Sequence, residues 1–442
     1  MGNTGIYVGL DIGTTSIKVI VAEYVKGQMN VIGVGSERSE GLSRGVVVDI
    51  DKSVAAIQQA VRQAERKTNI EIQKVTAGIP ANLLEIEPCQ GMIAVADESK
   101  EINDSDVRNV AAAALVRNLP PEREILTIIP DEFIVDGFDG IKDPRGMIGV
   151  RLEMHGILLT APKTVIHNMQ KCIERAGLVL DELVMNPLSL GKLALADGEQ
   201  DFGTVLIDLG GGQSTAAVIH DHKLKYTYVD QEGGDYITKD ISVVLNTSFD
   251  SAEKVKRDYG YADSLQASSE EDFPVEVVGK EAPVTVNEKY LAEIIEARLT
   301  QIFEKMNQSL RKVGALDLPG GIVMTGGVTA LPGIVELASD VFEHNVKLYI
   351  PDEMGLRHPS FAQALSLINY TANLSEIDLI VQSTLKGNYA TNKSNYTAKQ
   401  VVKPDSEQFR PANNQTATQK EASEPKKERF AGIKKFISNF FE

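Results

Sequence analysis

The chain has 442 residues, which is too long for one compact domain and predicts several. Hydrophobic residues make up 43% and charged residues 24% of it, as in soluble globular proteins, so disorder throughout is excluded. The net charge of −17 and the absence of tryptophan argue against a nucleic-acid-binding surface. Cys89 and Cys172 have no metal-binding or redox spacing, and we interpret them as buried thiols of a reducing compartment.

No segment of the sequence has the features of a leader or of a membrane span. Asp11 and Lys18 interrupt the first apolar stretch, so it lacks the uncharged core of a signal peptide. No run of 18 apolar residues occurs, so no transmembrane helix is expected. These features predict a protein of the cytoplasm.

Near the N-terminus, a β-branched strand ends at Asp11, and a turn containing Gly13, Thr14 and Thr15 leads into a strand that carries Lys18. Glycine lets backbone N–H groups approach phosphate oxygens closely, and the threonine hydroxyls add donors. A carboxylate beside such a turn can hold the water shell of Mg²⁺. The segment predicts half of a phosphate clamp, although plain hairpins share this pattern.

The same design recurs in residues 204–218, where Asp208 ends a strand 197 residues after Asp11. The turn that follows consists of Gly210, Gly211, Gly212 and Gln213. Two copies of one hairpin indicate a body made of two related halves, and they favour a nucleotide clamp over two unrelated turns.

A third glycine-rich element follows an apolar strand, at Gly326, Gly327 and Val328. Such a glycine pair leaves bare backbone, against which a flat purine and its ribose can lie. The sequence has neither a GxxxxGK[ST] phosphate loop nor a GxGxxG dinucleotide fingerprint after a strand, so those two sites are excluded.

The C-terminal part changes composition. Residues 371–427 are rich in Asn, Ser, Thr, Gln, Lys and Pro, which predicts a disordered linker. Residues 428–442 are basic and amphipathic, which predicts a helix that lies in the plane of an anionic membrane; docking on the protein core is the alternative. The residues assigned to the membrane are Phe430, Ile433, Phe436, Ile437, Phe440, Phe441, Lys434 and Lys435.

The three glycine-rich elements resemble the actin/Hsp70/sugar-kinase superfamily, with phosphate loops at 11–18 and 208–215 and an adenosine loop at 324–328. Residues 5–370 and the amphipathic end are most similar to the FtsA family of bacterial actin-like division proteins. The resemblance implies an α/β, actin-like (ribonuclease H-like) duplicated fold. Two halves surround a nucleotide cleft and form four subdomains, followed by a flexible C-terminal tail.

The resemblance also implies how the chain is divided. Subdomain IA comprises 1–84 and 161–194, the family-specific insert IC comprises 85–160, IIA comprises 195–226 and 300–370, and the partner-binding IIB comprises 227–299, followed by the linker 371–427 and the amphipathic helix 428–442. The sequence supports an α+β insert independently, because residues 107–115 have helical spacing between strand-like runs.

By the same resemblance, Glu253 and Lys256 match nucleoside contacts, and Gly234 and Asp235 a phosphate-side turn. A solvent-exposed ion pair is the other interpretation of Glu253 and Lys256. Arg298 matches the basic residue that meets the acidic C-terminal tail of the ring protein FtsZ, while an exposed helix cation is its other interpretation.

The resemblance implies a polymerising adaptor that binds ATP and Mg²⁺, with Asp11 and Asp208 holding the metal through water. Such an adaptor tethers the FtsZ ring to the cytoplasmic face of the membrane at the septum and helps to recruit other division proteins. Its expected partners are the FtsZ tail, further copies of itself and the anionic inner leaflet, but no nucleic acid.

Catalysis is expected to be slow or absent. Related ATPases place a water-orienting Gln, Glu or Asp near the first connecting helix, where this chain has Asn186, so no catalytic residue is assigned. The alternative function is a soluble ATP-dependent kinase or chaperone of the same superfamily, in which Asp235 could act as a base.

Overall fold

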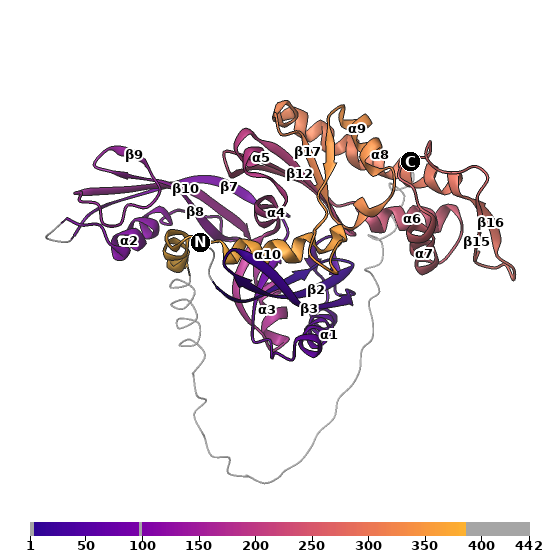
Figure 1. Ribbon diagram of the computed structural model, residues 1–442, viewed down its shortest axis with the longest axis horizontal. Helices are drawn as coiled ribbons and strands as arrows, with labels where there is room; N and C mark the ends of the chain where they lie inside the picture. Colours follow the sequence, from indigo (N-terminus) through magenta and orange to yellow (C-terminus); the bar gives the residue numbers. More distant parts are fainter. Residues whose placement is uncertain (1–3, 97–99, 386–442) are drawn as a thin grey trace, which may run out of the picture. The chain divides into compact units, whose positions relative to one another are not determined.

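The computed structural model describes residues 4–96 and 100–385. Its first half is built on a five-stranded sheet in the order β11-β6-β1-β2-β3 (Figure 1). The strands are β1 (Gly5–Ile12), β2 (Ser16–Val25), β3 (Gln28–Arg38), β6 (Lys74–Ile79) and β11 (Val179–Met185). The first three pair as an antiparallel meander, and β6 and β11 continue the sheet in parallel from β1.

The second half repeats this topology in the order β18-β17-β12-β13-β14. Its strands are β12 (Thr204–Leu209), β13 (Ser214–His220), β14 (Lys223–Asp230), β17 (Ile322–Thr325) and β18 (Val346–Leu348). Again three antiparallel strands are followed by two parallel ones. The duplication inferred from the two Asp-Gly hairpins is therefore present in the sheets, because each hairpin joins the first two strands of its meander.

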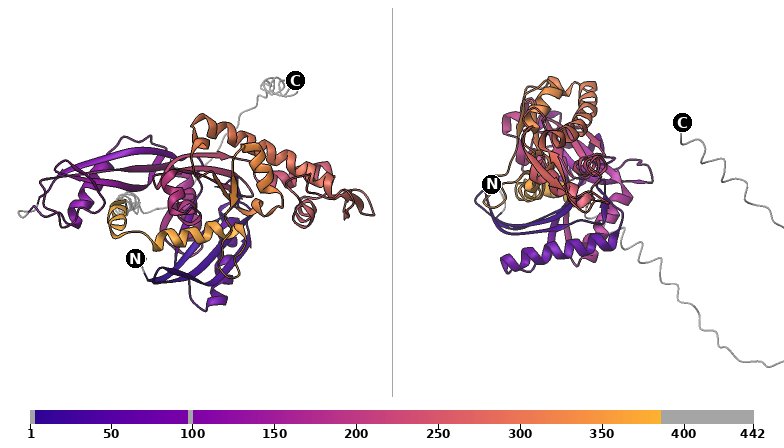
Figure 2. Two further views of the ribbon diagram at one scale, coloured as in Figure 1. Left: turned by 45° about the horizontal axis from the view of Figure 1, so that its top comes forward. Right: turned by 90° about the vertical axis from the view of Figure 1, so that its right-hand side faces the viewer.

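Helices cover both faces of the two sheets. The first sheet packs on α1 (Ile50–Thr68) and α3 (Lys163–Arg175), and the second on α6 (Gly234–Val244), α8 (Glu288–Lys312) and α9 (Ile334–Phe342). On the remaining faces, α10 (Ala362–Ala372) packs against the first sheet and α4 (Asn186–Ala194) against the second, and these two helices also contact each other (Figure 2). The shared helical layer joins the two halves beneath the hairpins.

The remaining elements are short connections or belong to the two interruptions. In the second half these are α7 (Phe249–Tyr259) and the hairpin of β15 (Asp272–Val275) and β16 (Val284–Asn287). The connections are β4 (Leu42–Ser43), β5 (Val46–Val47), α5 (Asp197–Phe202) and the 3₁₀ turns η1 (Ala315–Asp317), η2 (Gly327–Ala330) and η3 (Pro359–Phe361).

The insert between β6 and α3 is a four-stranded antiparallel sheet in the order β7-β10-β8-β9. It consists of β7 (Glu85–Ala94), β8 (Arg123–Val135), β9 (Phe138–Ile141) and β10 (Arg151–Pro162), with α2 (Asp104–Ala114) packed on one face. Asn103 caps α2, because its side chain accepts from the backbone of Ser105 and Asp106 while Asp106 bonds back to Asn103. The helical spacing seen in the sequence thus corresponds to α2.

A helix at residues 376–385 completes the core of the insert. Ile377, Val381 and Leu385 are buried in it, and Glu376 pairs with Arg145 at 3.2 Å. The prediction that a disordered linker starts at residue 371 is therefore wrong, because apolar residues at helical spacing bury a face that the polar average composition conceals. The rest of the predicted linker, and the whole of 428–442, lie outside the described residues.

We predict that Val381→Asp will loosen the insert, because Val381 is fully buried and an unpaired carboxylate there costs about 3 kcal/mol or more. Hydrogen exchange should rise in α2 and β7. Leu379→Asp is the matched control, since Leu379 lies on the same helix but is 42% exposed. Equal protection in both variants would contradict a structural role for residues 376–385.

Candidate nucleotide-binding site

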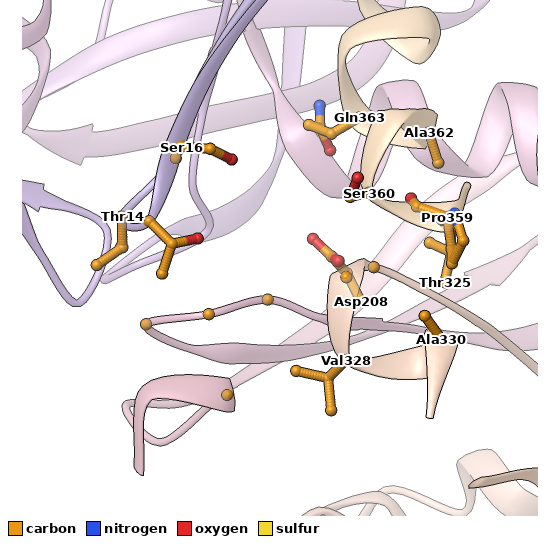
Figure 3. A pocket seen from close by; sticks show the side chains of 18 of the residues that line it. Thr14, Ser16, Asp208, Thr325, Val328, Ala330, Pro359, Ser360, Ala362 and Gln363 are labelled. Carbon is orange, nitrogen blue, oxygen red and sulfur yellow. Dashed lines mark hydrogen bonds between the residues drawn. The ribbon is translucent and has the colours of Figure 1, made fainter. Parts of the chain in front are cut away.

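A cavity of about 570 Å³ lies where the hairpins of the two sheets face each other (Figure 3). The structure brings together in its lining every residue that the sequence assigned to a nucleotide or a metal. These residues are Asp11, Gly13, Thr14, Thr15, Lys18, Asp208, Gly210, Gly211, Gly212, Gln213, Gly234, Asp235, Glu253, Lys256, Gly326, Gly327 and Val328. Segments far apart in the sequence therefore share one site.

The turns of the two hairpins are closed by equivalent hydrogen bonds, and the two turns contact each other. In each turn a glycine N–H donates to the carbonyl three residues later, at 3.1 Å from Gly13 and 3.0 Å from Gly210. The second turn lies directly against the threonines of the first. A Cβ on Gly211 would come within 2.3 Å of the Thr15 side chain, and one on Gly212 within 2.5 Å of Thr14. Glycine is required here by close approach.

The two aspartates are buried beneath these turns. Lys18 lies 3.8 Å from Asp11, and burial raises the pKa of Asp11 despite this neighbour. Burial, and then the charge of Asp11, raise the pKa of Asp208 to about 7, with Lys18 opposing both. In Figure 3 the Asp208 carboxylate points into the pocket, toward the space between Thr14 and Ser360. Two buried carboxylates with one lysine fit an additional cation.

The adenosine loop reaches the cavity through β17, which pairs in parallel with β12 so that Thr325 lies beside Asp208. Gly326 has φ +100°, and a Cβ on it would lie 2.4 Å from the Asp208 carboxylate. Gly327 has more room, because its nearest neighbour is the Ser360 Cβ at 3.6 Å. The backbone at residue 326 therefore requires glycine, whereas Gly327 has room for a side chain beside the cavity.

Lys256 lines the cavity, but its ammonium is already bonded to other groups of the protein. It donates to Gly234 O at 3.0 Å and Thr238 Oγ1 at 2.7 Å, and it pairs with Glu253 at 2.6 Å. Burial opposes ionisation of Glu253, but Lys256 outweighs it, so the pKa of Glu253 is lowered. Three partners use all three donors of an ammonium. Lys256 therefore ties α7 to the turn at Gly234, and the pair is more than a solvent-exposed ion pair.

Residues 358–363 also line the cavity, and the sequence analysis missed them. The segment belongs to η3 and the start of α10, and it carries His358, Ser360 and Gln363. Burial, and then the charge of Lys18, lower the pKa of His358. No glycine-rich or charged motif marks this segment, so only the packing of α10 against the first sheet could have revealed it.

Asn186 begins α4 and lines the cavity, as its position near the first connecting helix suggested. Its Oδ1 is buried without a hydrogen-bond partner, and so is Oε1 of Gln213. Neither amide can accept a proton as a base, but both can accept a hydrogen bond from water or ligand. Two residues that line the cavity therefore carry acceptors without a hydrogen-bond partner.

Arg298 lies outside the cavity and is not an exposed cation, contrary to one interpretation of the sequence. Its guanidinium binds Asp240 through two nitrogens, at 2.6 and 3.0 Å, and Glu232 at 3.0 Å. These bonds raise the pKa of Arg298, and its side chain is only 19% exposed. An external carboxylate would have to compete with two internal ones.

Among the described residues, no three His, Cys, Asp or Glu side chains are grouped as a ready-made metal site. Within the same part of the chain, no helix has the length and apolar character needed to cross a bilayer.

Comparison with protein families gives two matches. The family described as "Cell division protein FtsA" matches residues 205–366, and the "SHS2 domain inserted in FTSA" matches residues 82–160. A cell division protein FtsA of Enterococcus hirae is 54% identical over 442 residues, with 100% of both chains covered.

Solved structures of similar fold are more distant in sequence. A chain of the PilM-PilN type IV pilus biogenesis complex has a TM-score of 0.58 and 16% identity, covering 84% of this chain and 100% of that one. MreB5 of Spiroplasma citri bound to ADP has a TM-score of 0.51 and 12% identity, covering 87% and 98%. At such identities the likeness concerns the fold alone, and the predicted actin-like, duplicated α/β fold is confirmed.

Proposed function

Because the chain belongs to the FtsA family of cell-division proteins, we propose that it is an ATP-binding, polymerising adaptor between the FtsZ ring and the membrane. It would lie on the cytoplasmic face at the septum and help to recruit other division proteins. The observation that carries the proposal is the convergence of both phosphate hairpins and the adenosine loop on one cavity. Full-length similarity to division proteins disfavours the alternative of a soluble kinase or chaperone.

The nucleotide is proposed to lie with its phosphates between the two hairpins and its adenosine against Gly326, Gly327 and Val328. The hairpins offer backbone N–H groups and the hydroxyls of Thr14 and Thr15 as donors. MreB5 of Spiroplasma citri, which is similar in fold, has ADP bound, and ADP is a nucleotide of the same class. The binding of ATP by this chain is proposed from the residues that line the cavity.

Asp11 and Asp208 would hold Mg²⁺ through water, beside the phosphates. Burial raises the pKa of both carboxyls, and the charge of Asp11 adds to this at Asp208, so a cation beside them would stabilise their ionised forms. When bound, the metal supplies positive charge to the phosphate oxygens. Asn186 would contact water without taking its proton, so we propose that hydrolysis is slow or absent.

We predict that Gly327→Asp and Gly212→Asp will abolish binding of Mg²⁺-ATP. Each places a carboxylate where phosphates or nucleoside would lie, and a Cβ at residue 212 would also clash with Thr14. Isothermal titration calorimetry measures the affinity. Gly198→Asp is the control, since Gly198 is exposed and a Cβ there meets nothing within 4 Å. Wild-type affinity in Gly327→Asp, whose site has room for the side chain, would refute the proposed nucleotide position.

Residues 227–299 are proposed to receive the acidic C-terminal tail of FtsZ, with Arg298 as the contact. A planar guanidinium suits carboxylate pairing, and exchange of Glu232 or Asp240 for a tail carboxylate would keep Arg298 paired. The subdomain insert at 85–160 is proposed to make the contacts between copies of the chain in filaments.

We predict that Arg298→Glu will weaken binding of an acidic FtsZ tail peptide by tenfold or more, because it reverses the charge at the contact. Fluorescence anisotropy with a labelled peptide measures this, and a melting curve checks that a third carboxylate beside Glu232 and Asp240 is tolerated. Arg311→Glu, at an exposed position on the same helix, is the matched control. If both variants bind the peptide equally, the contact lies elsewhere.

The membrane anchor is proposed to be the amphipathic segment 428–442, which lies outside the described residues. Six apolar residues of its sequence follow the 3–4 spacing of one helical face, and four of them are phenylalanines. Each contributes about 1.5–3 kcal/mol when buried, and each basic residue near anionic lipid about 1 kcal/mol. Affinity for vesicles should therefore fall as salt rises.

We predict that Phe436→Glu with Phe440→Glu will move the protein to the supernatant when it is sedimented with anionic vesicles. The matched control is Ser438→Glu with Asn439→Glu, which adds the same two charges to the polar face of the segment. The control should retain most of its vesicle binding, because its apolar face is intact. Sedimentation of the phenylalanine double variant with the vesicles would exclude this anchor.

A further inference from the structure

Arg44 and Tyr236 contact each other beside the cavity, next to its lining residues Gly45 and Asp235. Arg44 lies in the two-residue turn between β4 and β5, in the first half of the chain, and Tyr236 lies in the first turn of α6, in the second. The Arg44 guanidinium donates to the Tyr236 hydroxyl at 2.6 Å and to Gln231 Oε1 at 3.2 Å. It also lies 5.9 Å from the centre of the tyrosine ring.

On the first side, the turn that carries Arg44 is bonded to the first phosphate hairpin. The N–H of Gly45 donates to Thr14 Oγ1 at 3.0 Å, and the Asn82 amide donates to the carbonyl of Arg44 at 2.7 Å. Gly45 itself lines the cavity, and a Cβ on it would come within 2.4 Å of the Gln213 side chain. Gly45 thus connects Arg44 to Thr14 of the first phosphate hairpin.

On the second side, Tyr236 follows a turn that is bonded to the second phosphate hairpin. The N–H groups of Gly234 and Asp235 donate to the carbonyls of Gly210 and Gly211, at 3.0 and 2.8 Å. Each partner of the Arg44–Tyr236 contact is thus one or two hydrogen bonds away from a different phosphate hairpin.

Arg298 holds the tyrosine in place from below. It binds Glu232 before this turn and Asp240 one helical turn after Tyr236, and its guanidinium lies 5.6 Å from the centre of the Tyr236 ring. The start of α6 is thereby fixed on both flanks, so the tyrosine hydroxyl is presented to Arg44 by a rigid element.

We propose that Arg44 and Tyr236 are positioning residues that form a clasp across the cleft and slow the release of bound nucleotide. The inference rests on the proposed function, since it concerns the same cavity. The closed clasp links the element bonded to the first phosphate hairpin with the element bonded to the second, so it opposes separation of the two halves. Arg44 and Tyr236 do not line the cavity and reach the hairpins only through neighbouring residues, so the clasp acts on the rate of opening.

The test measures association and dissociation of a fluorescent Mg²⁺-ATP analogue by stopped flow, using the full chain. Arg44→Ala and Tyr236→Phe should each raise the dissociation rate about three- to tenfold, the range expected for the loss of one solvent-exposed hydrogen bond. Association rates should stay within twofold. The double variant should release the analogue no faster than the faster single variant, because both remove one interaction.

Arg66→Ala and Tyr290→Phe are matched controls, since both residues are exposed and lie outside the cleft. Their dissociation rates should equal that of the wild type. Unchanged release in Arg44→Ala and Tyr236→Phe, or multiplied effects in the double variant, would overturn the clasp alone. If the wild type binds no Mg²⁺-ATP at all, the proposed nucleotide site fails together with the clasp.

Discussion

The contact between the two phosphate hairpins is the constraint on which the rest of the site depends. Thr14 and Thr15 lie so close to Gly211 and Gly212 that any side chain on either glycine would overlap a threonine. The two sheets must therefore meet at their hairpins. They are also joined through α4 and α10, which pack on the two sheets and contact each other. The cavity is the space that remains beside this contact, between the hairpins and the residues that precede α10.

This constraint also explains the electrostatics. Bringing equivalent hairpins together brings their aspartates together, because each aspartate lies one residue before the end of the first strand of its hairpin. Asp11 and Asp208 are buried, and Lys18 compensates them only in part, so the pKa of both carboxyls is raised. The same geometry that places the two glycine turns side by side thus concentrates negative charge beneath them. A divalent metal ion held there through water would supply positive charge that Lys18 alone does not.

The sequence allowed the glycine-rich turns of the site to be predicted. It did not allow prediction of the hydrogen bonds between residues that are far apart in the chain. A strand, an aspartate and a glycine turn form a hairpin from neighbouring residues, so the phosphate loops, the adenosine loop and the repeat of the two halves could be recognised. Lys256 and Arg298 could be recognised only as basic residues, because their partners Thr238 and Glu232 lie 18 and 66 residues away. Nucleotide binding by Lys256 and tail binding by Arg298 remain predictions. In the structure both side chains already have internal hydrogen-bond partners.

The same distinction between local and tertiary information accounts for the misplaced start of the linker. Residues 376–385 belong to a stretch, 371–427, that is polar as a whole, and their helix is stable because Ile377, Val381 and Leu385 enter the core of the insert.

This packing has a consequence for the adaptor proposed above. The last described residue, Leu385, is buried in the insert, and Glu376 is paired with Arg145 there. If the segment beyond it anchors the chain to a membrane, tension enters the fold through the insert, not through α10. The insert would then be loaded by the anchor while it is proposed to meet neighbouring copies of the chain. Attachment and assembly would thus act on one sheet, at a distance from the cavity.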